Sequence, residues 1–528
     1  MVIKQEKKAK SPEHMPEKGK NGVQITDIKC SACAVCSSVC PFEAILIDKC
    51  TGEVKLDIEK CQVCGICVST CPVSAIETVY YDSDSLIGYI KRSLSETKAD
   101  NLLLTCKSND PITSNVREIL RKQNLTKFIS LRLPCVGRIS PEFILKTLGL
   151  GIKRIAVVPC KDYCRFEEGS RVGVRRFKLM QSLLSQMNLT TALTIIEDLP
   201  KAHIQTDKCI SCGDCVEACS NQAIQLKSSP RAAEINADKC SGCGACVVVC
   251  PTLAINIDES ENEEFLAPIS IEKDGRSGLK KEGKEPAILA FCCQWSEFSA
   301  SNATRIDSLD TDLHVKELPC AANVEPRHIL KAFLVGFDGV LVAACKKNEC
   351  KLGKGNEKAE RRVEALKKIL SRYSLDDRLE ICFTSPRYTK EFKTFCDSFA
   401  KALRNRGLLN LDSGKKEELK AAIEALNFER PRLILERSQI LLEKGQNVFD
   451  EEVSQEEFYE MLKPVEKEFM RSKILLSMGE APLSIREIAQ IIGASPKEVV
   501  AQMISLEREG QVSIKEIVGY TPKYYKIK

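Results

Sequence analysis

The sequence predicts a multidomain protein of mixed α/β and α+β class, and three observations support that prediction. The chain has 528 residues, too many for one hydrophobic core, so roughly three to five domains are expected. Most of its 28 cysteines fall into patterns that occur twice along the chain. Between those patterns, short apolar runs alternate with helical stretches, whereas the region after residue 412 contains no cysteine.

The composition excludes disordered and membrane-spanning proteins. Hydrophobic residues make up 43% and charged residues 29% of the chain, as in a folded soluble protein. No apolar run approaches the roughly 18 to 20 residues of a membrane helix. Residues 1–24 are rich in Lys and Glu and lack the apolar stretch of a signal peptide. We therefore expect a cytoplasmic protein without membrane insertion, with a disordered tail over 1–24.

The cysteine content points to metal ligation. A cytosolic compartment keeps thiols reduced, so 28 cysteines beside only 4 histidines favour metal sites over disulfides. The formal net charge of +5 counts each cysteine as neutral. Ligation deprotonates thiols, so the assembled protein is expected to be acidic. The apparent basicity is thus weak evidence for nucleic-acid binding.

Four cysteine runs share the spacing x2, x2, x3, and three of them are followed by Pro, while Ser220 follows the third run. This is the spacing of bacterial ferredoxins with two 4Fe-4S clusters, in which the fourth Cys of each run ligates the other cluster. Zinc is the alternative, but zinc sites rarely use three cysteines at this spacing and need no crossed partner run. The spacing therefore predicts two ferredoxin-like modules, over 25–82 and 201–262.

The crossed arrangement assigns sixteen ligands to four 4Fe-4S clusters. Cluster one takes Cys30, Cys33, Cys36 and Cys71, and cluster two takes Cys61, Cys64, Cys67 and Cys40. Cluster three takes Cys209, Cys212, Cys215 and Cys250, and cluster four takes Cys240, Cys243, Cys246 and Cys219.

The other cysteines repeat as well. Cys135 and Cys320 each end a Leu-Pro-Cys segment, 185 residues apart, and Cys160 and Cys345 end apolar runs at the same shift. Cys106 and Cys292 also end apolar runs, 186 residues apart, which places Lys107 where the second copy has Cys293. The chain therefore consists of two copies of one unit, each a ferredoxin-like module followed by a second domain.

The second domain of each copy is predicted to be a small parallel α/β domain, over 83–200 and 285–408. Apolar runs alternate with helical stretches such as Pro326–Gly336, Lys358–Ser371 and Tyr388–Arg404, a pattern typical of a parallel sheet with crossover helices. Its cysteines follow the strands, at the carboxyl edge where ligands bind in open α/β sheets. The candidate ligands are Cys106, Cys135, Cys160 and Cys164 in the first copy, and Cys292 or Cys293, Cys320, Cys345 and Cys350 in the second. They suit a small iron–sulfur cluster; buried structural thiols or zinc are the alternatives.

Residues 287–405 resemble the delta subunit of methyl-viologen-reducing hydrogenase. The matching residues are Phe291-Cys292-Cys293-Gln294-Trp295, the Cys320 segment, Gly336–Val342, Cys345 with Cys350, Gly355-Asn356 and Arg361-Arg362; Ser296 replaces one further cysteine of the family. Residues 100–197 look like a diverged copy that keeps Cys106, Cys135, Cys160, Cys164, Gly173 and Arg175-Arg176. The resemblance implies a 2Fe-2S cluster in one or both domains. It also implies a relay between a donor enzyme and a heterodisulfide-reductase-like flavoprotein.

The cysteine-free C-terminal region is predicted to hold a helical linker over 413–463 and a winged-helix-like domain over 464–528. Helices are expected at Phe469–Met478, Ser484–Ile492 and Ser495–Gly510, and strands at Gln511–Ile514 and Lys523–Ile527. The third helix is net acidic, whereas a helix that enters a DNA groove presents positive charge to phosphates. Protein docking is therefore favoured over DNA binding.

The predicted function is electron transfer, by a chain that has no catalytic residues of its own. We expect four 4Fe-4S clusters, one or two 2Fe-2S clusters and redox protein partners. No Gly-x-Gly-x-x-Gly follows a strand, so no flavin or dinucleotide site of that type is expected. Two alternatives remain: a redox-sensing regulator that acts through the winged helix, and a reductase of a thiol or disulfide substrate at one of the strand-edge sites.

Overall fold

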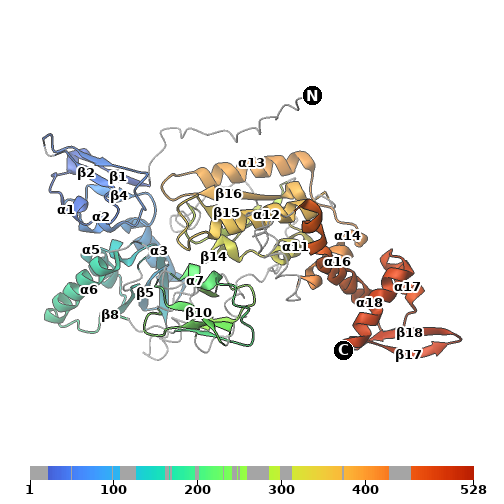
Figure 1. Ribbon diagram of the computed structural model, residues 1–528. Helices are drawn as coiled ribbons and strands as arrows, with labels where there is room; N and C mark the ends of the chain where they lie inside the picture. Colours follow the sequence, from blue (N-terminus) through green and yellow to red (C-terminus); the bar gives the residue numbers. More distant parts are fainter. Residues whose placement is uncertain are drawn as a thin grey trace, which may run out of the picture.

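A computed structural model describes the chain from residue 22 to 527 (Figure 1). Residues 49, 98, 108–126, 161–163, 165, 167–168, 197–200, 220, 230, 241–245, 248–249, 258–284, 298–311, 371–373 and 427–453 are not described, nor are the side chains of 365, 368–369 and 455–462. Most of the predicted tail 1–24 therefore lies outside the described residues, but its last two residues begin the first strand.

The first ferredoxin-like segment, here called module one, consists of two antiparallel strand pairs and two short helices. In chain order its elements are β1 (Val23–Ile25), η1 (Asp27–Lys29), α1 (Val35–Ser38), β2 (Ile45–Ile47), β3 (Val54–Leu56), α2 (Ile66–Thr70) and β4 (Ile76–Thr78). β1 pairs with β4, and β2 pairs with β3. The pairing of the outermost strands brings the two cysteine runs together, as the crossed arrangement requires.

Module one leads into the first parallel α/β segment, here called domain one. Its elements are α3 (Ser83–Glu96), β5 (Asn101–Cys106), β6 (Phe128–Leu133), η2 (Val136–Arg138), α5 (Pro141–Gly149), β7 (Arg154–Val158), α6 (Gly169–Gln186) and β8 (Leu193–Ile195). The strands are all parallel, in the order β6-β5-β7-β8. The predicted parallel sheet is confirmed. The order reverses between β5 and β7, the position of the ligand crevice in such sheets.

The second copy repeats this organisation. Module two comprises β9 (Ala202–Ile204), α7 (Asp214–Ala218), β10 (Ile224–Ser228), β11 (Arg231–Ile235) and β12 (Ile255–Ile257), with antiparallel pairs β9–β12 and β10–β11. Domain two comprises β13 (Ala287–Cys293), β14 (Asp312–Leu318), η5 (Ala321–Asn323), α11 (Pro326–Val335), β15 (Gly339–Cys345), α12 (Gly355–Leu370), η7 (Asp376–Arg378), β16 (Leu379–Thr384) and α13 (Glu391–Arg406). Its parallel sheet has the matching order β14-β13-β15-β16.

Helices cover both faces of the domain-two sheet. Alternate residues of a strand point to opposite faces. Leu289, Phe291 and Cys293 of β13 pack with α11 and α12 on one face. Ile288 and Cys292 pack with α13 on the other. Figure 1 shows α13 lying across the opposite side of the sheet from α11.

The two α/β domains meet through equivalent positions. Lys107 Nζ donates to the Gln294 carbonyl at 2.7 Å, and Arg132 Nη1 lies 3.6 Å from Glu317 Oε1. Lys107 and Gln294 occupy the same place in the two sheets, since each N–H donates to the leucine carbonyl that ends the neighbouring strand. Arg132 and Glu317 each precede that leucine. Because equivalent residues contact one another, the interface has an approximate two-fold arrangement.

The C-terminal region is helical and ends in a hairpin. Its elements are α14 (Ser413–Ala425), α16 (Gln455–Ser477), α17 (Ile485–Ile492), α18 (Pro496–Arg508), β17 (Val512–Val518) and β18 (Thr521–Lys526). Ser484 and Ser495 cap α17 and α18 as expected, each in a capping box. α16 begins well before the predicted helix at 469, so the boundary predicted at 463/464 falls inside a helix; part of the predicted linker lies outside the described residues. In the described part of the chain, none of the helices combines the length and apolar character of a membrane span.

Candidate metal centres

Three pockets in the ferredoxin-like modules each collect one complete crossed set of thiols. A pocket of about 340 Å³ is lined by Cys30, Cys33, Cys36 and Cys71. One of about 350 Å³ is lined by Cys40, Cys61, Cys64 and Cys67. A third, of about 330 Å³, is lined by Cys209, Cys212, Cys215 and Cys250. These volumes include the open solvent at each mouth. Four thiols around a space of this size form the ligand set that a 4Fe-4S cluster needs.

The fourth predicted set is only partly described. Cys219, Cys240 and Cys246 pack in the core of module two beside Cys215. Cys243 lies outside the described residues.

The backbone near each cysteine run donates a hydrogen bond to a cysteine sulfur. The last cysteine of every run accepts a hydrogen bond from the N–H of an alanine four residues later. The pairs are Ala44–Cys40 at 3.4 Å, Ala75–Cys71 at 3.2 Å, Ala223–Cys219 at 3.3 Å and Ala254–Cys250 at 3.2 Å. Hydrogen bonds to sulfur stabilise a thiolate and influence the potential of a cluster. The sequence analysis did not identify these alanines, although their spacing repeats in all four runs.

The four candidate ligand cysteines of domain one lie together at the carboxyl edge of its sheet. Cys106 hydrogen-bonds with Cys135 and Cys160, and Cys164 with the same two thiols. The hydrogen bonds from Cys135 and Cys160 lower the pKa of the Cys164 thiol to about 3. The pKa values of Cys106, Cys135 and Cys160 are raised instead, because these buried thiols lie beside one another and beside Cys164.

Domain two has the same cluster, formed by Cys293, Cys320, Cys345 and Cys350. The Cys293 and Cys345 sulfurs lie 3.5 Å apart, and Cys320 hydrogen-bonds with Cys293 and Cys350. Hydrogen bonds from Cys320 and Cys345 hold the pKa of Cys293 well below its usual value, and the bond from Cys320 lowers the pKa of Cys350 to about 7. As in domain one, the thiols lie at the reversal of strand order.

Cys292 is not part of this thiol cluster. As the neighbour of Cys293 in β13, it points to the opposite face and packs with Cys382 and Cys396 under α13. Burial raises its pKa, and these two cysteines reinforce the shift. The prediction that Cys292 is a metal ligand was therefore wrong, because successive residues of a strand point to opposite faces of the sheet.

The alignment of Cys106 with Cys292 is also corrected. Cys106 pairs with Leu133, and Cys293 pairs with Leu318, the leucines of the two Leu-Pro-Cys segments. Cys106 is thus equivalent to Cys293, and Lys107 to Gln294. Lys107 therefore does not stand in the place of Cys293, as the 186-residue shift had suggested.

Two further contacts at the thiol clusters repeat between the domains. A Cβ on Gly169 would lie 2.9 Å from Cys135 Sγ, and one on Gly355 would lie 2.4 Å from Cys320 Sγ. These glycines are the first residues of α6 and α12, so the N-terminus of each helix lies in close contact with a thiol. Arg176 binds the carbonyls of Gly137 and Ile139, and Arg362 binds those of the equivalent Ala322 and Val324. Gly169 could have been found by the 186-residue shift from Gly355.

Module one packs its second cysteine loop against domain one. Ile66 lies between Cys64 and Cys67 in sequence, and a Cβ on Gly169 would contact both its Cδ1 and Cys135 Sγ at 2.9 Å. Ser69 Oγ donates to the Gly137 carbonyl at 2.7 Å. The cluster-two pocket and the domain-one thiols are thus separated by little more than one side chain.

The same loop also contacts domain two. Lys351 Nζ donates to Gln62 Oε1 at 2.6 Å, and Arg387 Nε donates to the Cys61 carbonyl at 2.7 Å. Lys351 interacts electrostatically with both Cys345 and Cys64. Module one therefore touches the thiol regions of both α/β domains.

Module two contacts domain two through Lys358 of α12. Its ammonium group lies 3.7 Å from Asp214, in the loop between Cys212 and Cys215. Burial lowers the pKa of Lys358 to about 8, whereas the nearby thiols of Cys212 and Cys320 favour its charged form. A single side chain thus lies close to the cluster-three pocket and to the domain-two thiols.

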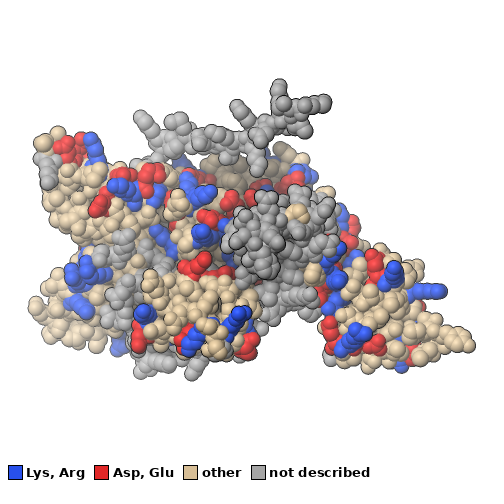
Figure 2. Space-filling model, viewed as in Figure 1, with Lys and Arg blue, Asp and Glu red and all other residues tan. Residues whose placement is uncertain are grey.

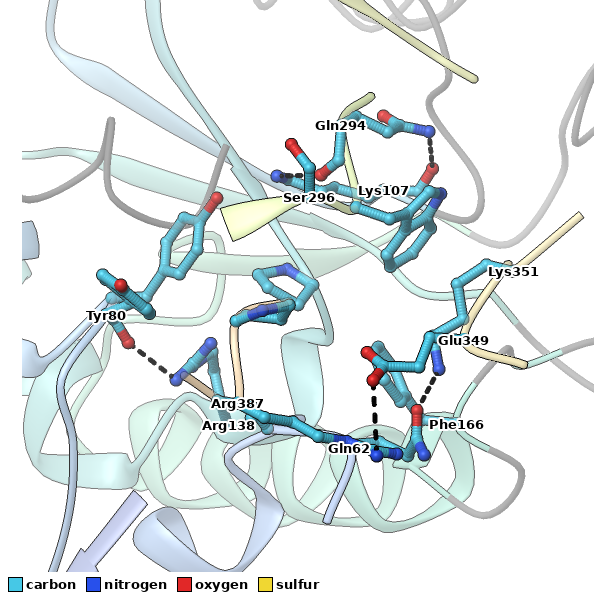
Figure 3. Close-up of a pocket in the computed structure, with 15 residues that line it drawn as sticks. Gln62, Tyr80, Lys107, Arg138, Phe166, Gln294, Ser296, Glu349, Lys351 and Arg387 are labelled. Atoms are coloured by element: carbon cyan, nitrogen blue, oxygen red, sulfur yellow. Dashed lines mark hydrogen bonds and ion pairs between the residues drawn. The ribbon is translucent and has the colours of Figure 1, made fainter. Parts of the chain in front are cut away.

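A pocket of about 520 Å³ lies where module one and both α/β domains meet (Figure 3). Its lining includes Lys107, Arg138, Lys351 and Arg387, opposed by Glu349. Figure 3 shows Lys351 reaching Gln62, and Glu349 facing Arg387, whose Nη1 lies 3.4 Å from the carboxylate. Basic side chains thus outnumber acidic ones at this junction, which lies between the thiol groups of module one and of the two α/β domains.

In the described part of the chain, no three or more His, Cys, Asp or Glu side chains are arranged around a single metal ion. The module pockets surround a space larger than one ion.

Comparison with known proteins identifies the family of the α/β domains. The family model for the methyl-viologen-reducing hydrogenase delta subunit matches residues 102–205 and 288–407. The chain is 35% identical over 112 residues to an iron-sulfur subunit of the vhu F420-non-reducing hydrogenase of Methanopyrus kandleri, covering 85% of that protein and 21% of this chain. The chain belongs to this family. The counterpart from Methanococcus maripaludis is 33% identical over 124 residues, which is 92% of that protein and 22% of this chain. The family domain is thus present twice.

The modules match iron–sulfur families. A 4Fe-4S dicluster domain model matches residues 208–265, and a 4Fe-4S binding domain model matches residues 54–77. The chain is also 39% identical over 209 residues, or 39% of its length, to one subunit of the ferredoxin/F420H2-dependent CoB-CoM heterodisulfide reductase of Methanosarcina acetivorans. The chain spans only 25% of the length of that protein.

Proposed function

We propose that this protein is a cytoplasmic, non-catalytic electron-transfer subunit. It relays electrons between a donor of the hydrogenase, formate dehydrogenase or ferredoxin type and a heterodisulfide-reductase-like flavoprotein. The observation that carries the proposal is the contact of thiol sites across module–domain boundaries. Domain one lies against cluster two through Ile66, and domain two lies against cluster three through Lys358.

The proposed cofactors are four 4Fe-4S clusters, in the four crossed sets of the modules, and one or two 2Fe-2S clusters in the α/β domains. These groups would supply reversible one-electron storage at each site. The residues present fit them. Complete sets of four thiols line the described pockets, N–H groups point at sulfur, and each α/β domain presents four contacting thiols.

The surrounding residues bind, shield and connect the sites. The apolar side chains of Ile25, Ile47 and Ile76 line the cluster-one pocket. Ile66 fills the space between cluster two and domain one. Lys351 and Arg387 of domain two donate hydrogen bonds to the second cysteine loop of module one. Module one is therefore the proposed junction of the relay, since its second cysteine loop contacts residues beside the thiol clusters of both α/β domains.

The relatives support the partner class. One is named as part of a heterodisulfide reductase and others as iron-sulfur subunits of hydrogenases. Those names describe the assemblies of the relatives themselves. For this chain they motivate the donor and acceptor classes proposed above.

The C-terminal helices and hairpin are proposed to dock a protein rather than nucleic acid. Figure 2 shows acidic and basic side chains mixed over this region, without a continuous basic face on the visible side. α18 has Glu498 and Glu507 beside Lys497 and Arg508. The hairpin exposes Ile517, Val518 and Tyr520. Such a surface can form apolar contacts with another protein, and its mixed charges attract phosphate groups only weakly.

The proposal is tested by electron delivery between purified partners. A reduced donor and a heterodisulfide-reductase-like flavoprotein are mixed anaerobically, with and without the full chain, and flavin reduction is followed by absorbance. We expect the chain to accelerate flavin reduction in proportion to its concentration, and Cys64→Ser to abolish most of the gain. Equal rates with and without the chain, with each candidate donor, would contradict the proposal.

A further inference from the structure

Arg138 of domain one reaches into the cysteine loop of module one. It ends η2, three residues after Cys135, and its side chain is 7% exposed. Its guanidinium group lies directly on Gly65, the residue between Cys64 and Ile66. A Cβ on Gly65 would lie 2.8 Å from Nη2 and 2.9 Å from Cζ. Gly65 has a φ of +81°, so the absence of a side chain serves both the turn and the approach of Arg138.

Part of this guanidinium group has no hydrogen-bond partner. Nη2 donates to Thr78 Oγ1 at 2.9 Å and to the Tyr80 carbonyl at 3.1 Å (Figure 3). Nη1 is buried and has no partner in the described part of the chain. A buried charged donor without an acceptor is costly, so an acceptor of negative character is expected beside Nη1.

The groups that face Arg138 are ligand thiols of two different sites. Apart from Tyr81, the residues that stabilise its charge are Cys64 and Cys67 of the cluster-two pocket and Cys135 of domain one. Burial raises the pKa of Cys64 to about 12, and the charge of Arg138 acts in the opposite direction. The sulfurs of a bound cluster would be the negative acceptors that Nη1 lacks.

In the second copy a lysine lies between the module and the domain, beside the first cysteine run of the module instead of the second. The residue equivalent to Arg138 is Asn323, whose Oδ1 accepts from the Cys320 N–H within its own domain. There Lys358 of α12 lies between Asp214 of module two and the thiol Cys320. Gly213, beside Asp214, holds the same place within its cysteine run as Gly65, although Gly65 lies in the second run of its module and Gly213 in the first. Both module–domain contacts thus include a cation beside a cysteine run, buried for Arg138 and 20% exposed for Lys358.

We propose that Arg138 is a positioning residue for the cluster held by Cys40, Cys61, Cys64 and Cys67. Its Nη1 donates a hydrogen bond to a sulfur of that cluster, and its positive charge raises the reduction potential of the cluster relative to the others. This inference rests on the proposed binding of a cluster by these four cysteines. A cation near a cluster stabilises the reduced form, which carries one more negative charge.

The test is an anaerobic redox titration of the full chain, followed by electron paramagnetic resonance and paired with iron and sulfide analysis. Arg138→Gln removes the charge and keeps a polar side chain. We expect unchanged iron content and one 4Fe-4S signal whose reduction equilibrium shifts about tenfold towards the oxidised form, or about 59 mV for one electron. Arg138→Lys should restore most of this shift.

Two matched variants separate the charge from interface packing. Ser69→Ala removes the hydrogen bond from Ser69 to the Gly137 carbonyl at the same interface without changing charge, and should leave every potential in place. Lys358→Met should shift a signal other than the one that Arg138→Gln shifts.

Unchanged potentials in iron-replete Arg138→Gln protein would overturn the inference. Loss of one cluster from both the Gln and the Lys variants would overturn it too, because it would show that Arg138 only maintains the packing of the loop. A wild-type chain without 4Fe-4S signals would refute the proposed function itself, so the two failures can be distinguished.

Discussion

Neighbouring cysteines of one strand have opposite environments in domain two. Cys293 contacts other ligand-type thiols, and their hydrogen bonds lower its pKa, whereas Cys292 is buried under α13 and its pKa is raised. The difference arises from the two-residue period of the strand. Only one of the pair can therefore serve a cluster at the sheet edge.

Cys293→Ser is predicted to remove the domain-two cluster, with a loss of about two irons per chain for a 2Fe-2S site. Cys292→Ser is the matched control, since the substitution is the same and lies one residue away. It should keep full iron content, with a modest loss of stability from a polar group in an apolar site. The measurement is the iron content of the two purified variants. Equal iron loss in both would show that Cys292 and Cys293 do not differ as ligands in the way that their opposite faces of the sheet imply.

Gly355→Ala is predicted to disturb the same site through steric crowding. The added methyl group would lie 2.4 Å from Cys320 Sγ, so either the thiol or the start of α12 has to move. Overpacking of this kind costs about 1–3 kcal/mol and should lower iron occupancy and the thermal midpoint. Gly149→Ala is the control, because a Cβ there meets nothing within 4 Å. Equal occupancy and midpoint in Gly355→Ala and wild type would contradict the geometry.

The crossed grouping of the module cysteines could be predicted from the sequence because their spacing is a local rule. In three of the four sets the structure brings the crossed ligands to one pocket. Arg138 and Lys358 could not be found in this way. Their importance depends on packing against Gly65 and Asp214, which are distant in the chain. No periodicity or motif indicates such contacts.

At the scale of secondary-structure elements, the duplication places matching strand ends against one another. The predicted parallel sheets, crossover helices and helix caps followed from hydrophobic periodicity and capping residues. The approximate two-fold contact between β5–β6 and β13–β14 did not. It depends on the chemistry of four edge side chains, Lys107, Arg132, Gln294 and Glu317, which differ between the copies and therefore gave no repeat to detect.

Lys107→Met is predicted to weaken the packing of the two α/β domains. The side chain is only 3% exposed, and its ammonium group donates to the Gln294 carbonyl. A hydrogen bond from a charged group contributes about 1.5–3 kcal/mol. Hydrogen exchange in β6 and β14 should accelerate accordingly.

Lys153→Met provides the control, since Lys153 forms an exposed pair with Asp100. Surface pairs contribute about 0–1 kcal/mol, so exchange in β6 and β14 should remain as in wild type. Equal exchange in both variants would show that Lys107 does not hold the interface.

At the scale of the whole molecule, four iron–sulfur-type segments alternate along one chain and meet in space. Module one contacts both α/β domains, and module two contacts domain two. The basic residues at these contacts would offset the negative charge of thiolates that ligate clusters at the proposed sites. The formal charge of the apoprotein, +5, therefore describes the chain before the sites are filled.

The central claim is that the thiol sites of the α/β domains form one relay with the module clusters. The most direct measurement is iron and acid-labile sulfide content of anaerobically purified full chain, with electron paramagnetic resonance during stepwise reduction. We predict about 18–20 irons per chain and a 2Fe-2S signal, lost in Cys320→Ser, besides the 4Fe-4S signals. About sixteen irons without a 2Fe-2S signal would contradict the claim and leave the α/β domains as scaffolds between the two modules.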